Sequence, residues 1–83
     1  MTKQLFGKRK VVTQEGRRLD FSYYKLRTRL GYGVCVGDQS ARYAAVTDIT
    51  KEEGEVEGLL RLLMRGRVSP VSLKDVVEDW KAR

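Results

Sequence analysis

Apolar and polar residues alternate along the first half of the chain in a way that is typical of β-strands. Residues 5–12 mix apolar and basic side chains and lead into residues 13–16, where Gly16 can supply the positive φ of a hairpin turn. The run 19–28 alternates as far as Tyr24 and is rich in aromatic residues, which favours a second strand. The pattern therefore predicts a strand, a turn and a strand.

A helix over residues 17–30 is the competing interpretation of the same segment. Leu19, Tyr23, Leu26 and Leu30 stand at positions i, i+4, i+7 and i+11, which lie on one face of a helix. The sequence leaves both interpretations open. Further along we expect a β-type segment at 31–36, a turn at 37–40 and another strand at 41–48.

The last third of the chain carries the start and stop signals of a helix over 51–65. Thr50 and Glu53 match a capping box, in which each side chain accepts a hydrogen bond from a free backbone N–H group. Gly66 suits the left-handed position that ends a helix. The apolar periodicity predicts a buried face made of Val56, Leu59, Leu60 and Leu63.

A second, shorter helix is expected after Pro70. Ser72 followed by Asp75 is the signal for its start. Its apolar face should be Leu73, Val76, Val77 and Trp80.

Two glycines, Gly54 and Gly58, stand one turn apart inside the first predicted helix, where each costs about 1 kcal/mol relative to alanine. They either form a flat strip against a neighbouring backbone or are simply tolerated on the solvent side.

These elements predict one α+β domain over residues 1–83, with a mainly β part at 1–49 and a helical part at 50–83. We expect an antiparallel meander of about four strands with two C-terminal helices packed on one face. The alternative is a split βαβ, ferredoxin-like fold with a helix at 17–30 and a last strand at 67–71. The first fold has two helices and the second has three.

The net positive charge lies entirely in the first part of the chain. Residues 1–49 hold ten Lys and Arg against four Asp and Glu, whereas residues 50–83 hold seven of each sign, so the net charge of +6 belongs to the β part. Such a surface could face a polyanion. The candidate phosphate contacts are Lys8, Arg9, Lys10, Arg17, Arg18, Arg27 and Arg29, and the candidate stacking residues are Tyr23, Tyr24 and Tyr32.

The same charges have a structural explanation, which we favour. Basic side chains on an outer strand keep the edge of a sheet from pairing with another chain. Under that interpretation Lys8, Arg9 and Lys10 protect an edge and keep the protein in solution.

Few residues offer catalytic or metal-binding chemistry. The chain has no histidine and one cysteine, so no Cys/His pair, no Ser-His-Asp relay and no usual zinc site is expected, and we predict no enzyme, metal or cofactor. Cys35 stands between two valines and should be a small core residue. No apolar run has more than four residues and the start has no apolar core, so we expect no membrane span, no secretory signal and a cytoplasmic location.

The segments Val46–Lys51, Leu59–Leu63 and Val68–Asp79 together resemble a family of small clostridial-type bacterial proteins known only as a domain of unknown function. The resemblance covers about 43–80 best. It implies N-terminal strands, a C-terminal pair of helices and a soluble cytoplasmic bacterial protein, and it carries over no functional residue.

On function, the leading hypothesis is a non-enzymatic interaction or regulatory module whose partner is another protein. Arg and Tyr, which are frequent in the predicted sheet, are favoured in the cores of interfaces. The alternative is nucleic-acid binding through the basic sheet half. A homo-oligomer stays open.

Overall fold

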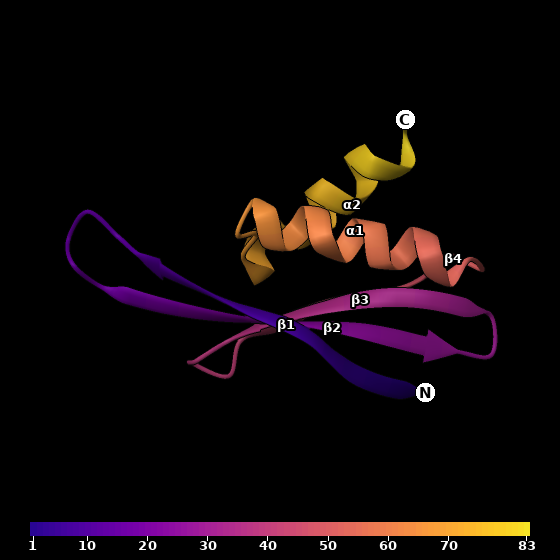
Figure 1. Cartoon of the computed structure of the whole chain (residues 1–83), viewed down its shortest axis with the longest axis horizontal. Coiled ribbons are helices and arrows are strands. Elements are labelled where there is room, and N and C mark those ends of the chain that lie inside the picture. The colour runs from indigo at the N-terminus through magenta and orange to yellow at the C-terminus, as the bar shows by residue number, and fades with distance from the viewer.

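The computed structural model describes all residues, 1–83. Four strands form one antiparallel sheet in chain order, and two α-helices joined by a short 3-10 helix follow them (Figure 1). The elements are β1 (Thr2–Val12), β2 (Arg18–Thr28), β3 (Gly31–Asp38), β4 (Tyr43–Thr50), α1 (Glu53–Arg65), η1 (Pro70–Ser72) and α2 (Leu73–Lys81). The predicted α+β meander with two C-terminal helices is confirmed.

The segment that also matched a helix is strand β2, so the helical interpretation of 17–30 and the ferredoxin-like alternative were wrong. Strand β2 pairs with β1 along one edge and with β3 along the other. Two ladders satisfy its backbone hydrogen bonds, and its buried Phe21 and Tyr23 lie two residues apart on one face. Tertiary pairing therefore overrode the helical periodicity.

The core lies between one face of the sheet, which we call the inner face, and the two helices. Phe21 and Tyr23 of β2 and Val34 and Val36 of β3 supply the sheet side. The helices supply Val56, Leu59, Leu60, Leu63, Leu73 and Val77, all at most 1% exposed. The predicted buried face of α1 is confirmed, and on α2 Val76 and Trp80 pack beside the core as expected.

Helix α1 begins two residues later than the capping box predicts. Thr50 is still paired with Tyr32 in the sheet, so it is the end of β4 and not a cap. Its hydroxyl accepts a hydrogen bond from the Glu52 N–H at 3.1 Å and donates to a Glu55 carboxylate oxygen at 2.7 Å. Glu52 stands at the N-cap with no side-chain cap. The expected reciprocal box between Thr50 and Glu53 does not form.

The left-handed residue at the end of α1 is Arg67 and not Gly66. Gly66 has φ −84°, a right-handed helical value, whereas Arg67 has φ 48°. The Arg67 N–H donates to Met64 O at 3.1 Å and the Val68 N–H donates to Leu63 O at 3.0 Å, which is the Schellman pattern. The loop to η1 therefore requires the left-handed conformation at Arg67, one residue after Gly66.

The start of α2 also differs from the prediction. Ser72 has helical backbone angles and caps nothing with its side chain, because the chain already coils from Pro70 through η1. Pro70 occupies the first turn, where its missing N–H costs little.

The two glycines of α1 face open space. A β-carbon at Gly54 or Gly58 would meet nothing within 4 Å. The solvent-side interpretation is therefore right, and no backbone packs against them.

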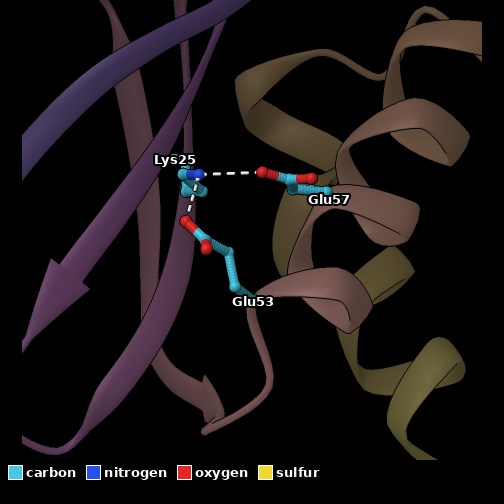
Figure 2. A network of polar contacts seen from close by, with 3 residues as sticks. All are labelled: Lys25, Glu53 and Glu57. Atoms are coloured by element: carbon cyan, nitrogen blue, oxygen red, sulfur yellow. Dashed lines mark hydrogen bonds and ion pairs between the residues drawn. The ribbon is translucent and has the colours of Figure 1, made fainter.

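An ion-pair network ties the sheet to α1 (Figure 2). Lys25 Nζ lies 2.6 Å from a Glu53 carboxylate oxygen and 2.9 Å from a Glu57 carboxylate oxygen. The hydrogen bonds raise the pKa of Lys25 above its ordinary value, and Lys25 lowers the pKa of Glu53. The pairs fix the start of α1 over β2.

The hairpin of β1 and β2 projects beyond the helices at one end of the molecule, and the side of the sheet away from the helices has no second layer (Figure 1). None of the helices has the length and apolar character needed to cross a bilayer.

Candidate interaction surface

The uncovered side of the sheet, which we call the outer face, is the candidate interaction surface. Side chains of directly paired residues in an antiparallel sheet lie on the same face. Leu5 pairs with Tyr24, Tyr24 with Cys35, and Cys35 with Ala45, so one row of side chains crosses all four strands on this face. Helix α1 and helix α2 pack on the opposite side.

The outer face has an apolar floor. Leu26 and Cys35 are only 2% and 5% exposed, although neither belongs to the core under the helices. Met1, Lys3, Tyr24 and Ala45 line a shallow hollow of about 510 Å³ around them. Tyr43 and Leu5, at 75% and 49% exposed, carry apolar surface beside it. A contiguous apolar patch of this kind marks an interaction site more often than scattered apolar residues do.

Cys35 is buried, as the sequence predicted, and it lies in the floor of the outer face and not in the cluster under the helices. Burial raises the pKa of its thiol, and the nearby charge of Lys3 acts in the opposite direction. The thiol is therefore protonated near neutral pH and packs as a small apolar group.

Positive charge gathers at the hairpin end of the outer face. Lys8 pairs with Ser22, Lys10 with Asp20, and Arg18 with Val12, which places all three cations on the outer face along the hairpin. Lys3 lies over the Tyr24 ring, 4.6 Å from its centroid. The carboxylate of the hairpin, Asp20, has its Oδ1 atom buried without a hydrogen-bond donor. The outer face is therefore apolar in the middle and basic at its hairpin end.

The candidate phosphate-binding residues do not form one surface. Arg9 pairs with Phe21 and so lies on the inner face, opposite its neighbours Lys8 and Lys10. Arg27 lies at the far end of β2, about 30 Å from Arg18 given the rise per residue of a strand, and Arg29 lies in the turn that follows. Lys8, Lys10, Arg17 and Arg18 are the members that the hairpin brings together.

The candidate stacking residues are also divided between the faces. Tyr23 is fully buried and its hydroxyl donates to Val68 O at 2.9 Å, so its ring cannot receive a base. Burial raises the pKa of Tyr23 to about 12. Tyr32 lies on the inner face with the Arg27 guanidinium 6.0 Å from its ring centroid. Tyr24 is the one of the three on the outer face.

Sequence reasoning missed the outer-face residues Leu5, Leu26, Tyr43 and Ala45. A usable signal was the uninterrupted apolar run Val34–Val36, because a strand that is apolar at consecutive positions has apolar side chains on both faces. Val34 and Val36 point to the helices, which leaves Cys35 on the side without helices.

No group of three or more His, Cys, Asp and Glu side chains is arranged to hold a metal ion.

The fold defines the class as a small α+β domain whose four-stranded sheet is covered on one side only. The chain belongs to DUF6514, a family of unknown function, and the family match spans residues 2–83. The match includes the strands as well as the helices. It is therefore wider than the segment 43–80 over which the sequence showed its best resemblance. The search of curated proteins and the search of solved structures found no match.

Proposed function

We propose that the protein is a non-enzymatic interaction module that binds a segment of another protein on the outer face of its sheet. The observation that carries the proposal is the exposed apolar surface of Met1, Leu5 and Tyr43. It lies around the shallow hollow over the buried Leu26 and Cys35, on the side of the sheet that no helix covers. The lack of histidine and the protonated, buried Cys35 thiol support a binding role over a catalytic one.

Charge complementarity indicates the chemistry of the partner. Lys3, Lys8, Lys10 and Arg18 lie on the outer face, and none of them forms an ion pair within the chain. A second copy of the same face would bring these cations against each other, which costs free energy. The partner we propose is therefore an acidic protein segment with apolar side chains that contact Leu5, Tyr43 and the floor.

The cellular setting belongs to the same proposal. The resemblance described above supports a bacterial protein of clostridial type. A single cysteine, which cannot form an internal disulfide, supports a reducing compartment such as the cytoplasm.

The test is a display library of random peptides selected on the wild-type protein and counter-selected on an outer-face variant, Leu5→Glu with Tyr43→Glu. Both side chains are exposed, so the variant should keep its fold, which circular dichroism would check. We expect enriched peptides that combine acidic and apolar residues and that lose binding to the variant. Failure to enrich any sequence over the counter-selection would remove the proposal. A concentration-dependent dimer that the variant abolishes would assign the face to self-association instead.

A second candidate function is nucleic-acid binding by the hairpin. The observation that favours it is the set of cations without an ion pair on the projecting hairpin, Lys8, Lys10, Arg17 and Arg18. Each phosphate that such a side chain neutralises makes binding weaken further as salt rises.

Fluorescence anisotropy of labelled single-stranded and duplex oligonucleotides, titrated at low and near-physiological salt, tests this candidate. Steep salt dependence and loss of binding in Arg17→Ala with Arg18→Ala would support it. An absence of binding at low salt would remove it and leave the protein-binding proposal in place.

A further inference from the structure

Three arginines from two elements line one shallow hollow on the helix side of the molecule. Arg9 comes from β1, and Arg61 and Arg65 come from α1, one turn apart. Phe6 and Met64 complete the lining, and the hollow has a volume of about 320 Å³. It lies on the inner side of the sheet, away from the outer face.

Met64 of α1 packs on Gly7, next to a bulge in β1. The pairing of β1 with β2 shifts between Leu5 and Gly7, so Phe6 has no direct partner. A β-carbon at Gly7 would collide with the methyl carbon of Met64, which therefore rests directly on the backbone of β1. The absence of a side chain at Gly7 leaves room for the end of the Met64 side chain against the strand that carries Arg9.

The charges in the hollow have no counterion within the chain. None of its five lining residues is acidic, and Arg9, Arg61 and Arg65 form no ion pair. Glu57, the acid one turn before Arg61, is bound by Lys25. Like charges one turn apart on a helix repel each other, and Arg9 adds a third.

Other roles account for only part of this arrangement. The C-terminal end of a helix attracts positive charge, which explains Arg65 in the last turn of α1. It does not explain Arg61 further back or Arg9 on a different element. The Arg9 guanidinium donates one hydrogen bond, to Lys8 O at 2.8 Å, so its remaining N–H groups are free.

We propose that this hollow binds the phosphate group of a small molecule. Guanidinium groups match the oxygens of a phosphate in pairs, and three of them around one hollow supply more donors than one phosphate needs. The side chains of Phe6 and Met64 offer apolar contact to a ring or carbon chain attached to the phosphate. The volume lies at the lower end of the range for small-molecule sites, about 300 Å³.

This site is independent of the outer face. It uses other residues on the opposite side of the sheet, so its failure and the failure of the protein-binding proposal are separate outcomes. It shares no residue with Arg17 and Arg18, on which the hairpin test of nucleic-acid binding depends.

The experiment is calorimetric titration of the full chain with inorganic phosphate and with phenyl phosphate at constant ionic strength. Amide chemical shifts in a ¹⁵N-labelled sample locate the site. The test variant is Arg61→Gln with Arg65→Gln, and the matched control is Lys74→Gln with Lys81→Gln on α2, which removes the same charge elsewhere. Both pairs are exposed, and thermal unfolding checks that each variant is folded.

We expect phenyl phosphate to bind more tightly than inorganic phosphate because of the apolar walls, with shifts at Phe6, Arg9 and Met64. The test variant should lose about tenfold or more in affinity, since charge-assisted hydrogen bonds are lost, and the control should change little. No binding at millimolar ligand, or an equal loss in both variants, would overturn the proposal. An oligonucleotide that binds the hollow and displaces phenyl phosphate would assign it to a polynucleotide and likewise overturn it.

Discussion

At the scale of single residues, Arg67 and Tyr23 show what the loop after α1 requires. Arg67 adopts φ 48°, a conformation in which a β-carbon crowds the backbone. The hydroxyl of Tyr23 reaches the carbonyl of the next residue, Val68, at 2.9 Å. One residue introduces strain into the loop and the other fastens it to the core.

Arg67→Gly should raise the free energy of unfolding by about 0.5 to 1 kcal/mol. Glycine has no β-carbon to crowd the backbone, and this gain exceeds the larger entropy that glycine loses on folding. Urea denaturation measures the change. Arg61→Gly, in the interior of α1, is the contrasting control and should lower the value by about 1 kcal/mol. A lower value for Arg67→Gly would mean that the Arg67 side chain stabilises the fold.

Tyr23→Phe should lower the free energy of unfolding by about 1 kcal/mol at neutral pH, because Val68 O loses its donor. The pKa of Tyr23 is raised to about 12 in the folded protein. The unfolded chain ionises near pH 10. Stability from this group is therefore complete below about pH 10 and is lost as pH rises through about 12.

Denaturation of wild type and Tyr23→Phe between neutral pH and alkaline pH measures this difference. The gap between the two proteins should narrow above about pH 10. Tyr24→Phe is the control, since it removes a phenol on the outer face. A gap that widens at alkaline pH would contradict the prediction.

At the scale of elements, the two ends of α1 are held in different ways. The Schellman turn closes its end, whereas no side chain caps its beginning. Lys25 of β2 holds the first turns of the helix against the sheet by binding Glu53 and Glu57. The acids there also face the positive end of the helix dipole.

Lys25→Met should lower the free energy of unfolding by about 1 kcal/mol near neutral pH, as expected for a partly exposed ion-pair network. The pKa of Lys25 is higher in the folded protein than in the unfolded chain, so the stabilisation by this group is present below about pH 10 and is lost at higher pH. The pKa of Glu53 is lower in the folded protein than in the unfolded chain, so the stabilisation by this group is present above about pH 4 and is lost as pH falls further.

Thermal or urea unfolding across the pH range tests this window. Lys74→Met on α2 removes an exposed lysine that forms no ion pair and is the matched control. An equal loss in both variants, or a Lys25→Met effect that persists at pH extremes, would show that the network does not stabilise α1.

Gly54→Ala and Gly58→Ala should each raise the free energy of unfolding by about 1 kcal/mol. A methyl group at either position meets nothing, and alanine loses less backbone entropy than glycine in a helix. Chemical denaturation of the single and double variants measures the gain. Gly33→Ala is the contrast, because its β-carbon would collide with Val46 O, and it should destabilise the fold.

At the scale of the whole molecule, net charge opposes compactness. The chain carries +6, and only Lys25 and Arg83 among its cations form ion pairs. Repulsion among exposed cations is screened by salt, with a Debye length of about 10 Å at 0.1 M.

The melting temperature should therefore rise by a few degrees as sodium chloride is raised from low to physiological concentration. Scanning calorimetry measures it. Sodium phosphate at equal ionic strength separates general screening from a bound anion, since a bound anion adds stabilisation beyond chloride. A melting temperature that falls with salt would mean that attractive pairs outweigh the repulsion.

The sequence predicted the order of the elements and the apolar stripe of α1, because helical and strand periods are local properties of the chain. It also located the cations of the hairpin, because the turn at Gly16 and the charges on either side of it are close together in the sequence. The sequence could not show which side chains of the sheet face the helices and which lie on the outer face. Tyr23 and Tyr24 are neighbours with the same side chain, yet one is buried in the core and the other lies on the outer face.

The tertiary structure decided what depends on contacts between distant residues. Adjacent strand residues point to opposite faces, and the face that becomes buried is the one on which the helices pack. The pairing of Thr50 with Tyr32 kept that threonine in the sheet and delayed the start of α1. The meeting of Arg9 with Arg61 and Arg65 likewise depends on the packing of α1 against β1. Local patterns fix the elements, and long-range packing fixes which side chains share a surface.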